Sequence, residues 1–138
     1  MLGAELDAQW RSGPWRLSGS VALADATVRA SGVAAALDGK RPAQSPRIAG
    51  SLRAAWRDAV GVTLRYQGAQ PEDDLNQRQL PDALTLDVDA AVPLAPGLSL
   101  YGRVENALDA QVVSGISASG IIDIAQPRAV WIGVRLTR

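Results

Sequence analysis

Residues 100–109 read LYGRVENALD, and this stretch decides between the possible folds of the chain. Its first six residues alternate between apolar and polar, with Leu100 and Val104 on one side and Arg103 and Glu105 on the other. Its last four residues have the composition of a turn. Alternation with a period of two predicts a β-strand with one apolar and one polar face. Soluble sandwiches and membrane barrels both contain such strands, so the remaining sequence has to separate them.

The same alternation recurs along the whole chain. One segment is ambiguous, because Ile48, Leu52 and Trp56 are spaced four apart, as they would be on one face of a helix. Gly50 and the arginines at 47, 53 and 57 keep the two-residue period there, which favours a strand. The sequence therefore predicts an all-β fold, an antiparallel up-and-down meander of about seven strands, at roughly residues 4–10, 15–23, 48–56, 60–66, 84–92, 98–104 and 130–136.

The connections between these strands alternate in length. Short turns at 12–14, 58–59 and 94–97 alternate with long polar segments at about 30–45, 69–81 and 109–125. Tight turns at one end and long loops at the other are typical of an outer-membrane barrel. A soluble sandwich more often has shorter strands and Greek-key crossovers. Bacterial barrels close with an even number of strands, so about seven strands predict part of a larger transmembrane β-barrel.

Composition narrows the function classes. The 138 residues carry 14 basic and 14 acidic side chains, so no net field attracts the chain to nucleic acid. There is no cysteine and no histidine, which removes thiolate metal sites, cysteine nucleophiles and histidine-based triads. We therefore expect no catalysis, no resident cofactor and no metal site.

Several segments then resemble one known family. RVENALD at 103–109 resembles the R-x-x-N-L-F-D segment near the end of TonB-dependent outer-membrane receptors, and QPR at 126–128 precedes a strand similar to their closing strand. GAEL at 3–6 resembles the G-x-E-L/V start of a barrel strand. KRPAQSPR at 40–47 resembles the family's P-x-x-P-R element. The segments occur in the family's order over essentially the whole chain.

The resemblance implies that residues 1–138 are the C-terminal segment of a plugged barrel of about 22 strands, with the plug and the N-terminal strands absent. It implies a receptor in the outer membrane of a Gram-negative bacterium, contacting outer-membrane lipid. An inner-membrane energy-coupling complex would act through the missing N-terminal region. The imported nutrient would be a siderophore, a cobalamin-like compound or a glycan. Family members tend to end in an aromatic residue, whereas position 138 is Arg, so either the true end has been lost or the chain inserts poorly.

The resemblance also orients the sheet and assigns its candidate residues. Short turns would be periplasmic and long loops extracellular. Polar side chains on the strands would face the lumen, and apolar ones would face lipid. Three tryptophans, Trp10, Trp15 and Trp56, fall near the short turns, where an interfacial girdle would lie, with packing in a core as the alternative. Trp131 falls on the polar side. The candidate lumen-facing residues are Glu5, Asp7, Arg53, Arg65, Asp87, Asp89, Arg103, Glu105 and Arg135.

The loop at 69–81 carries the candidate ligand contacts Asp73, Asp74 and Asn76. With Glu72 these residues offer oxygen ligands of the kind calcium takes, but their spacing matches no EF-hand loop, so a solvated loop is the favoured interpretation. Two alternatives to the receptor remain open. One is a soluble all-β ligand-binding module of lipocalin-like type, whose apolar stripe would pack inward. The other is a small barrel that closes by dimerisation.

Overall fold

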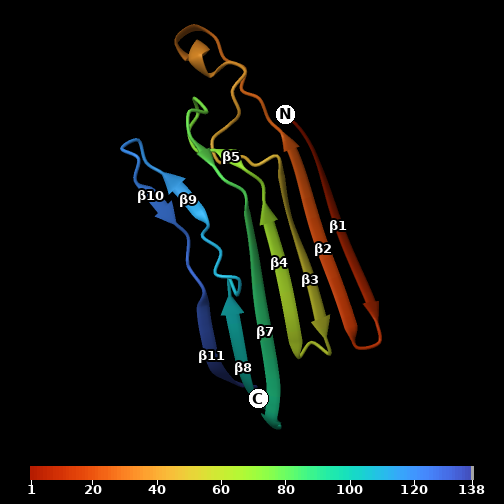
Figure 1. The fold of residues 1–138 in the computed structure, drawn as a ribbon. Coiled ribbons are helices and arrows are strands. Elements are labelled where there is room, and N and C mark those ends of the chain that lie inside the picture. The colour runs from red at the N-terminus through yellow and green to blue at the C-terminus, as the bar shows by residue number, and fades with distance from the viewer. Residues whose placement is uncertain (138) are drawn as a thin grey trace.

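A computed structural model describes residues 1–137, and its main feature is one open antiparallel sheet (Figure 1). The sheet has seven strands in the order β1-β2-β3-β4-β7-β8-β11, so its strands lie side by side in the order in which they occur along the chain. The predicted up-and-down meander is therefore confirmed. The strands are β1 (Leu2–Ser12), β2 (Trp15–Asp25), β3 (Ile48–Trp56), β4 (Val60–Gln67), β7 (Ala83–Ala95), β8 (Leu98–Glu105) and β11 (Ala129–Leu136).

The register keeps the two faces of the sheet distinct. Asp7 lies opposite Ser20 on the polar face, while Leu6 lies opposite Val21 on the apolar face. The ambiguous segment 48–56 is strand β3, as favoured from the sequence. Because each strand pairs in register with the next, a one-residue slip would move its apolar side chains to the polar face.

Short turns join the strands at one end of the sheet. The third turn differs from its predicted position, because β7 continues through Pro93 to Ala95 and only Pro96 and Gly97 connect it to β8. A register shift between Pro93 and Ala95 accommodates a residue that cannot donate a ladder hydrogen bond. Gly97 takes a left-handed conformation with φ of 75°, which suits a tight hairpin turn.

The long loops gather at the opposite end, as Figure 1 shows. They contain more regular structure than the sequence predicted. The first loop holds a 3₁₀ helix, η1 (Gly32–Leu37). The second contains a small hairpin of β5 (Gln70–Pro71) and β6 (Gln79–Leu80), and the third a hairpin of β9 (Val113–Ile116) and β10 (Ile122–Ile124). Strands of two to four residues are too short to show a period in sequence.

No part of the described chain packs on the apolar face of the sheet. Leu52 is 55% exposed and Ile132 is 78% exposed, and the buried apolar residues among those described are few and small or loop-bound, such as Ala55 and Leu80. The apolar side chains thus do not converge on a sealed interior. The soluble module of lipocalin-like type would require such an interior. Within residues 1–137 no helix is long and apolar enough to cross a bilayer. Position 138, where the sequence has Arg in place of the family's terminal aromatic residue, lies outside the described residues.

Aromatic side chains lie at both ends of this apolar face. Trp10, Trp15 and Trp56 lie on it near the short turns, and Tyr66 lies on it near the loop end. Between them the face carries mainly leucine, valine, alanine and glycine. The arrangement matches the predicted position of the three tryptophans.

Candidate functional site on the polar face of the sheet

All nine candidate lumen residues share the polar face, because each has the same parity in the strand register. The structure places six of them in ion pairs, which form one separate pair and one group of four. Glu5 and Asp7 on β1 and Arg135 on β11 lie outside this group, and the Arg135 guanidinium is 5.7 Å from the centre of the Tyr101 ring. That this face is the lumen stays a prediction. The six in contact are Arg53, Arg65, Asp87, Asp89, Arg103 and Glu105.

The Arg53–Asp89 pair reaches across a whole strand. Arg53 on β3 donates two hydrogen bonds to the Asp89 carboxylate on β7, at 2.6 and 2.9 Å, and a third to the Thr63 hydroxyl at 2.9 Å. Strand β4 lies between them, and its residue opposite Asp89 is Gly61. A Cβ atom on Gly61 would lie 2.7 Å from the guanidinium carbon of Arg53. The glycine therefore leaves the path for the arginine open.

Asp87 is the centre of the network. Its side chain is only 8% exposed and lies between Arg65 on β4, with which it forms an ion pair, and Arg103 on β8 at 3.5 Å. The backbone N–H of Asn106 donates to its second carboxylate oxygen at 3.0 Å. A carboxylate this buried is stabilised by two cations and a backbone donor, which also tie β4, β7 and the end of β8 together.

The segment from which the fold was inferred ends β8 and begins the third loop. Asn106 has a left-handed backbone, and its side-chain amide exchanges two hydrogen bonds with the backbone of Ala110, at 2.9 and 3.0 Å. Asp109 accepts from the backbone N–H of Arg128 at 3.1 Å and pairs with its guanidinium at 3.4 Å. Arg103, Asn106 and Asp109 therefore each stabilise the start or end of this loop.

Trp131 has a partner that the sequence analysis missed. Its indole N–H donates to Glu105 at 3.2 Å, and Glu105 also pairs with Arg103 at 3.1 Å. Trp131 lies opposite Arg103 in the register, so Glu105 is its diagonal neighbour. Diagonal neighbours on one face of a sheet are within reach of long side chains, and this relation could have been found from the predicted strands.

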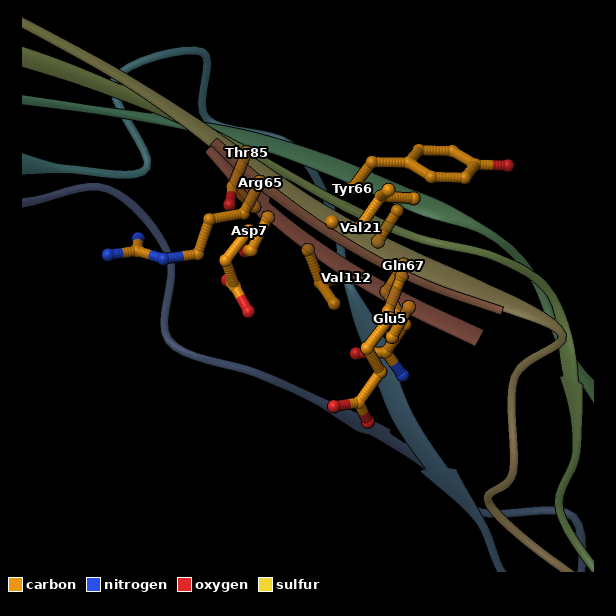
Figure 2. Close-up of a pocket in the computed structure, with 13 residues that line it drawn as sticks. Glu5, Asp7, Val21, Arg65, Tyr66, Gln67, Thr85 and Val112 are labelled. Carbon is orange, nitrogen blue, oxygen red and sulfur yellow. The ribbon is translucent and has the colours of Figure 1, made fainter. Parts of the chain in front are cut away.

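An open hollow of about 490 Å³ lies on the polar face towards the loop end. Figure 2 shows Glu5, Asp7 and Gln67 on one side of the sheet and Tyr66 on the other. Val112, which follows the loop start and precedes β9, also lines the hollow. The start of the third loop therefore lies close to the polar face of the strands at the loop end of the sheet.

The three long loops are joined by side-chain contacts centred on Glu72. The Glu72 carboxylate accepts from the side-chain amide of Gln44 in the first loop and from the backbone N–H of Ile116 in the third, both at 3.2 Å. Gln44 also donates its backbone N–H to Pro71 at 2.7 Å. From the sequence Glu72 was a possible calcium ligand only, and its role in joining the loops depends on contacts between distant segments.

The candidate ligand contacts in the second loop are placed differently from one another. Asn76 exchanges two hydrogen bonds, both at 2.8 Å, with the backbone of Arg41 in the first loop. Asp73 accepts from the backbone N–H groups of Gln77 at 3.1 Å and Arg78 at 2.8 Å. These donors, Gln77 first, lower the pKa of Asp73 against a smaller opposing effect of burial. Asp74 is exposed. Contact of the three with a ligand stays a prediction.

No group of three or more acidic, cysteine or histidine side chains within residues 1–137 is arranged to hold a metal ion. Three carboxylates on the polar face, those of Asp87, Asp89 and Glu105, are instead paired with arginines. The arrangement is chemically suited to presenting fixed charges of both signs along a wide surface.

An up-and-down sheet with one apolar exposed face, aromatic residues at both ends of that face and a charged opposite face defines the wall of a transmembrane β-barrel. The family model described as "TonB dependent receptor-like, beta-barrel" matches residues 2–107. The chain belongs to this family, so the resemblance found in the sequence is confirmed.

Solved structures with the same fold include two receptors and a transporter. The siderophore receptor PiuA from Acinetobacter baumannii is 18% identical, with a TM-score of 0.83 over 97% of this chain and 21% of that one. The ferric yersiniabactin uptake receptor FyuA from Yersinia pestis is 20% identical, with a TM-score of 0.85 over 97% and 23%. The ferric citrate transporter FecA is 21% identical, with a TM-score of 0.74 over 89% and 21%.

The chain spans about a fifth of the length of these structures. Among curated proteins, none matches the sequence.

Proposed function

We propose that this chain forms part of the wall of an outer-membrane receptor that imports a scarce nutrient with energy supplied from the inner membrane. The observation that carries the proposal is the contrast between the two faces of one sheet. Leu52 and Ile132 are exposed on one face, whereas Arg53, Asp87 and Asp89 are paired on the other. Lipid offers no hydrogen bonds, so it suits the first face, and a water-filled or plug-filled lumen suits the second.

The sheet alone would not transport a solute. Its order ends at β1 on one side and β11 on the other, so further strands are needed to close a wall around a lumen. In the proposal a plug domain and the other barrel strands complete the receptor, and the energy-coupling complex acts through the plug region. The function is transport without catalysis, as expected for the family.

The polar face would supply part of the lumen surface. Its ion pairs hold Asp87 and Asp89 in fixed positions, while Glu5 and Asp7 line the hollow near the loops. We place the loop end outside the cell and the short turns in the periplasm. In this orientation the hollow and the exposed Asp74 lie on the route by which a ligand would enter.

A siderophore, a cobalamin-like compound and a glycan remain the proposed ligand classes. Two of the receptors with this fold are a siderophore receptor and a ferric yersiniabactin uptake receptor, which supports the first class for this chain without deciding among the three.

Orientation can be tested by cysteine labelling, because the chain has no cysteine of its own. Asp74→Cys would place a thiol in an exposed loop, and Ala59→Cys would place a matched thiol in a short turn. We expect a membrane-impermeant maleimide to label Asp74→Cys on intact cells expressing the complete receptor, and to label Ala59→Cys only after the outer membrane is permeabilised. Equal labelling of the two on intact cells would contradict the proposed orientation.

The soluble alternative makes an opposite prediction for the purified chain. A membrane wall should require detergent to stay dispersed, because its apolar face is uncovered. A monodisperse chain in plain buffer would favour the soluble module. A monodisperse dimer in detergent would favour the small barrel that closes by dimerisation.

A further inference from the structure

The turn between β3 and β4 places an arginine on the apolar face of the sheet. By alternation Arg57 would follow Arg53 and Ala55 onto the polar face. It instead has a left-handed backbone with φ of 52°, and its guanidinium lies 4.5 Å from the centre of the Trp56 ring, which belongs to the apolar face. The turn thus moves a cation from the polar to the apolar side.

This position is fixed by the neighbouring turn. The backbone N–H of Arg57 donates to the carbonyl oxygen of Pro14 at 2.6 Å, which joins the β3–β4 turn to the β1–β2 turn. Asp58 forms an ion pair with Arg16 at 2.8 Å, so this carboxylate is engaged elsewhere. Within residues 1–137 no ion pair involves Arg57. A guanidinium stacked on a ring keeps the N–H groups in its plane available to an acceptor.

Two further tryptophans lie on the same face at the same end of the sheet. Trp56 lies directly opposite Trp15 in the register, and Trp10 lies on the adjacent strand near the same end. Trp15 is 50% exposed and Trp56 is 38% exposed, so the rings are open to whatever covers the face. Indole rings favour the boundary between hydrocarbon and headgroups, where one edge is apolar and the other is wet.

The depth of the site matches that boundary. Strand β3 has nine residues from Ile48 to Trp56. At about 3.3 Å per residue and a tilt of about 40° it crosses roughly 23 Å, close to the apolar band of about 25 Å on such barrels. Arg57 follows directly, so its guanidinium would lie at the level of the phosphates of the periplasmic leaflet.

We propose that Arg57, Trp56 and Trp15 form a binding site for the phosphate of a phospholipid headgroup, with the two rings packed against the glycerol and the upper acyl chain. The proposal rests on the proposed function, because it needs the apolar face to meet lipid. It goes beyond that function by assigning one fixed lipid site to the turn end of the wall. Positive charge and aromatic surface together complement a headgroup better than either does alone.

The test uses the 138-residue chain folded in a maltoside detergent, which contains no phosphate. It is titrated with phosphatidylglycerol or with diacylglycerol, both carrying the same brominated acyl chains, and tryptophan fluorescence is followed. We expect phosphatidylglycerol to quench at a mole fraction about fivefold to tenfold lower than diacylglycerol. Arg57→Gln should remove this preference, and Arg57→Lys should retain part of it.

Arg11→Gln is the matched control. Arg11 lies at the same end of the sheet on the opposite, polar face, and it should leave the preference unchanged. Equal quenching by the two lipids in the unsubstituted chain would overturn the proposal, and so would an equal loss in Arg11→Gln and Arg57→Gln. If Arg57→Gln does not fold, the proposal is decided by comparing quenching by phosphatidylglycerol with quenching by diacylglycerol, in the unsubstituted chain and in Arg57→Lys.

Two further outcomes separate the sources of failure. If soluble glycerol phosphate displaces phosphatidylglycerol as well as unbrominated phosphatidylglycerol does, the site is a general anion site and the lipid proposal is wrong. If neither brominated lipid quenches any tryptophan, the apolar face does not meet lipid, and the proposed function itself fails.

Discussion

Replacing Asp87 with alanine should lower the free energy of unfolding by about 3 kcal/mol. The side chain is 8% exposed, and its removal leaves the backbone N–H of the buried Asn106 without its acceptor, at a cost of about 1–3 kcal/mol. Arg65 and Arg103 lose a carboxylate as well, but their side chains are 50% and 45% exposed. Water screens these two pairs, so each contributes at most about 1 kcal/mol.

Asparagine at position 87 separates the two contributions. It keeps an oxygen that can accept from Asn106 and loses only the charge, so we expect Asp87→Asn to cost about 1–2 kcal/mol. The measurement is equilibrium unfolding by denaturant in detergent, followed by tryptophan fluorescence. Asp58→Ala is the control, because the Arg16–Asp58 pair is exposed on both sides and its loss should cost less than about 1 kcal/mol. A cost for Asp87→Ala no larger than for Asp58→Ala would refute this reasoning.

Three further predictions concern the network and the loops. Gly61→Ala should destabilise the sheet by about 1–2 kcal/mol in the same unfolding assay, because the new methyl group would displace Arg53 from its carboxylate partner. Glu72→Ala should accelerate hydrogen exchange at the Ile116 amide, which loses its acceptor. The pKa of Asp73 is lowered in the folded loop, so its stabilising effect is full above the unfolded pKa of about 3.9 and is lost as the pH falls towards the folded value. Amide exchange in the second loop at decreasing pH should report that loss.

Each of these predictions has a matched control. Gly102→Ala should be tolerated better than the change at 61, because its nearest neighbour would be a carbonyl oxygen at 3.7 Å. Asp74→Ala should leave exchange at Ile116 unchanged, since Asp74 is exposed in the same loop. Asp73→Asn should remove the acid dependence. Equal effects of the two glycine substitutions, or an acid dependence that survives Asp73→Asn, would contradict the corresponding prediction.

The strands and their faces could be predicted because they depend on local alternation. Each of the seven long strands has a period of two over seven or more residues, and register then follows from short turns. Even the segment with helical spacing at 48–56 was resolved by its arginines. The same parity placed all nine charged candidates on one face.

The pairings within that face could not be predicted from alternation. The Arg53–Asp89 pair skips a strand and depends on the absence of a side chain at Gly61, which a period does not show. The link between Asp87 and the backbone of Asn106 depends on how β8 ends. The extension of β7 past Pro93 depends on a bulge that the sequence suggests only by its proline.

The loops were predicted least well. Their hairpins are held by contacts between segments far apart in sequence, such as Glu72 with Gln44 and Ile116. Composition identified polar loops correctly, and ligand contact by Asp73 and Asn76 stays a prediction. It did not show that these two side chains also hold the first and second loops. Of that predicted set, Asp74 has the exposed side chain.

The most direct test of the account is a spin-label scan of the two faces of the sheet, on strands β3, β4 and β11. Single cysteines at Leu52 and Ile132 on the apolar face and at Ser51 and Thr63 on the polar face would carry the label, in the complete receptor reconstituted in vesicles. We predict that labels at the first pair are accessible to oxygen, which partitions into hydrocarbon, and shielded from a water-soluble nickel complex. Labels at 52 and 132 that are shielded from both reagents would instead indicate a protein interior on that side and contradict the barrel wall.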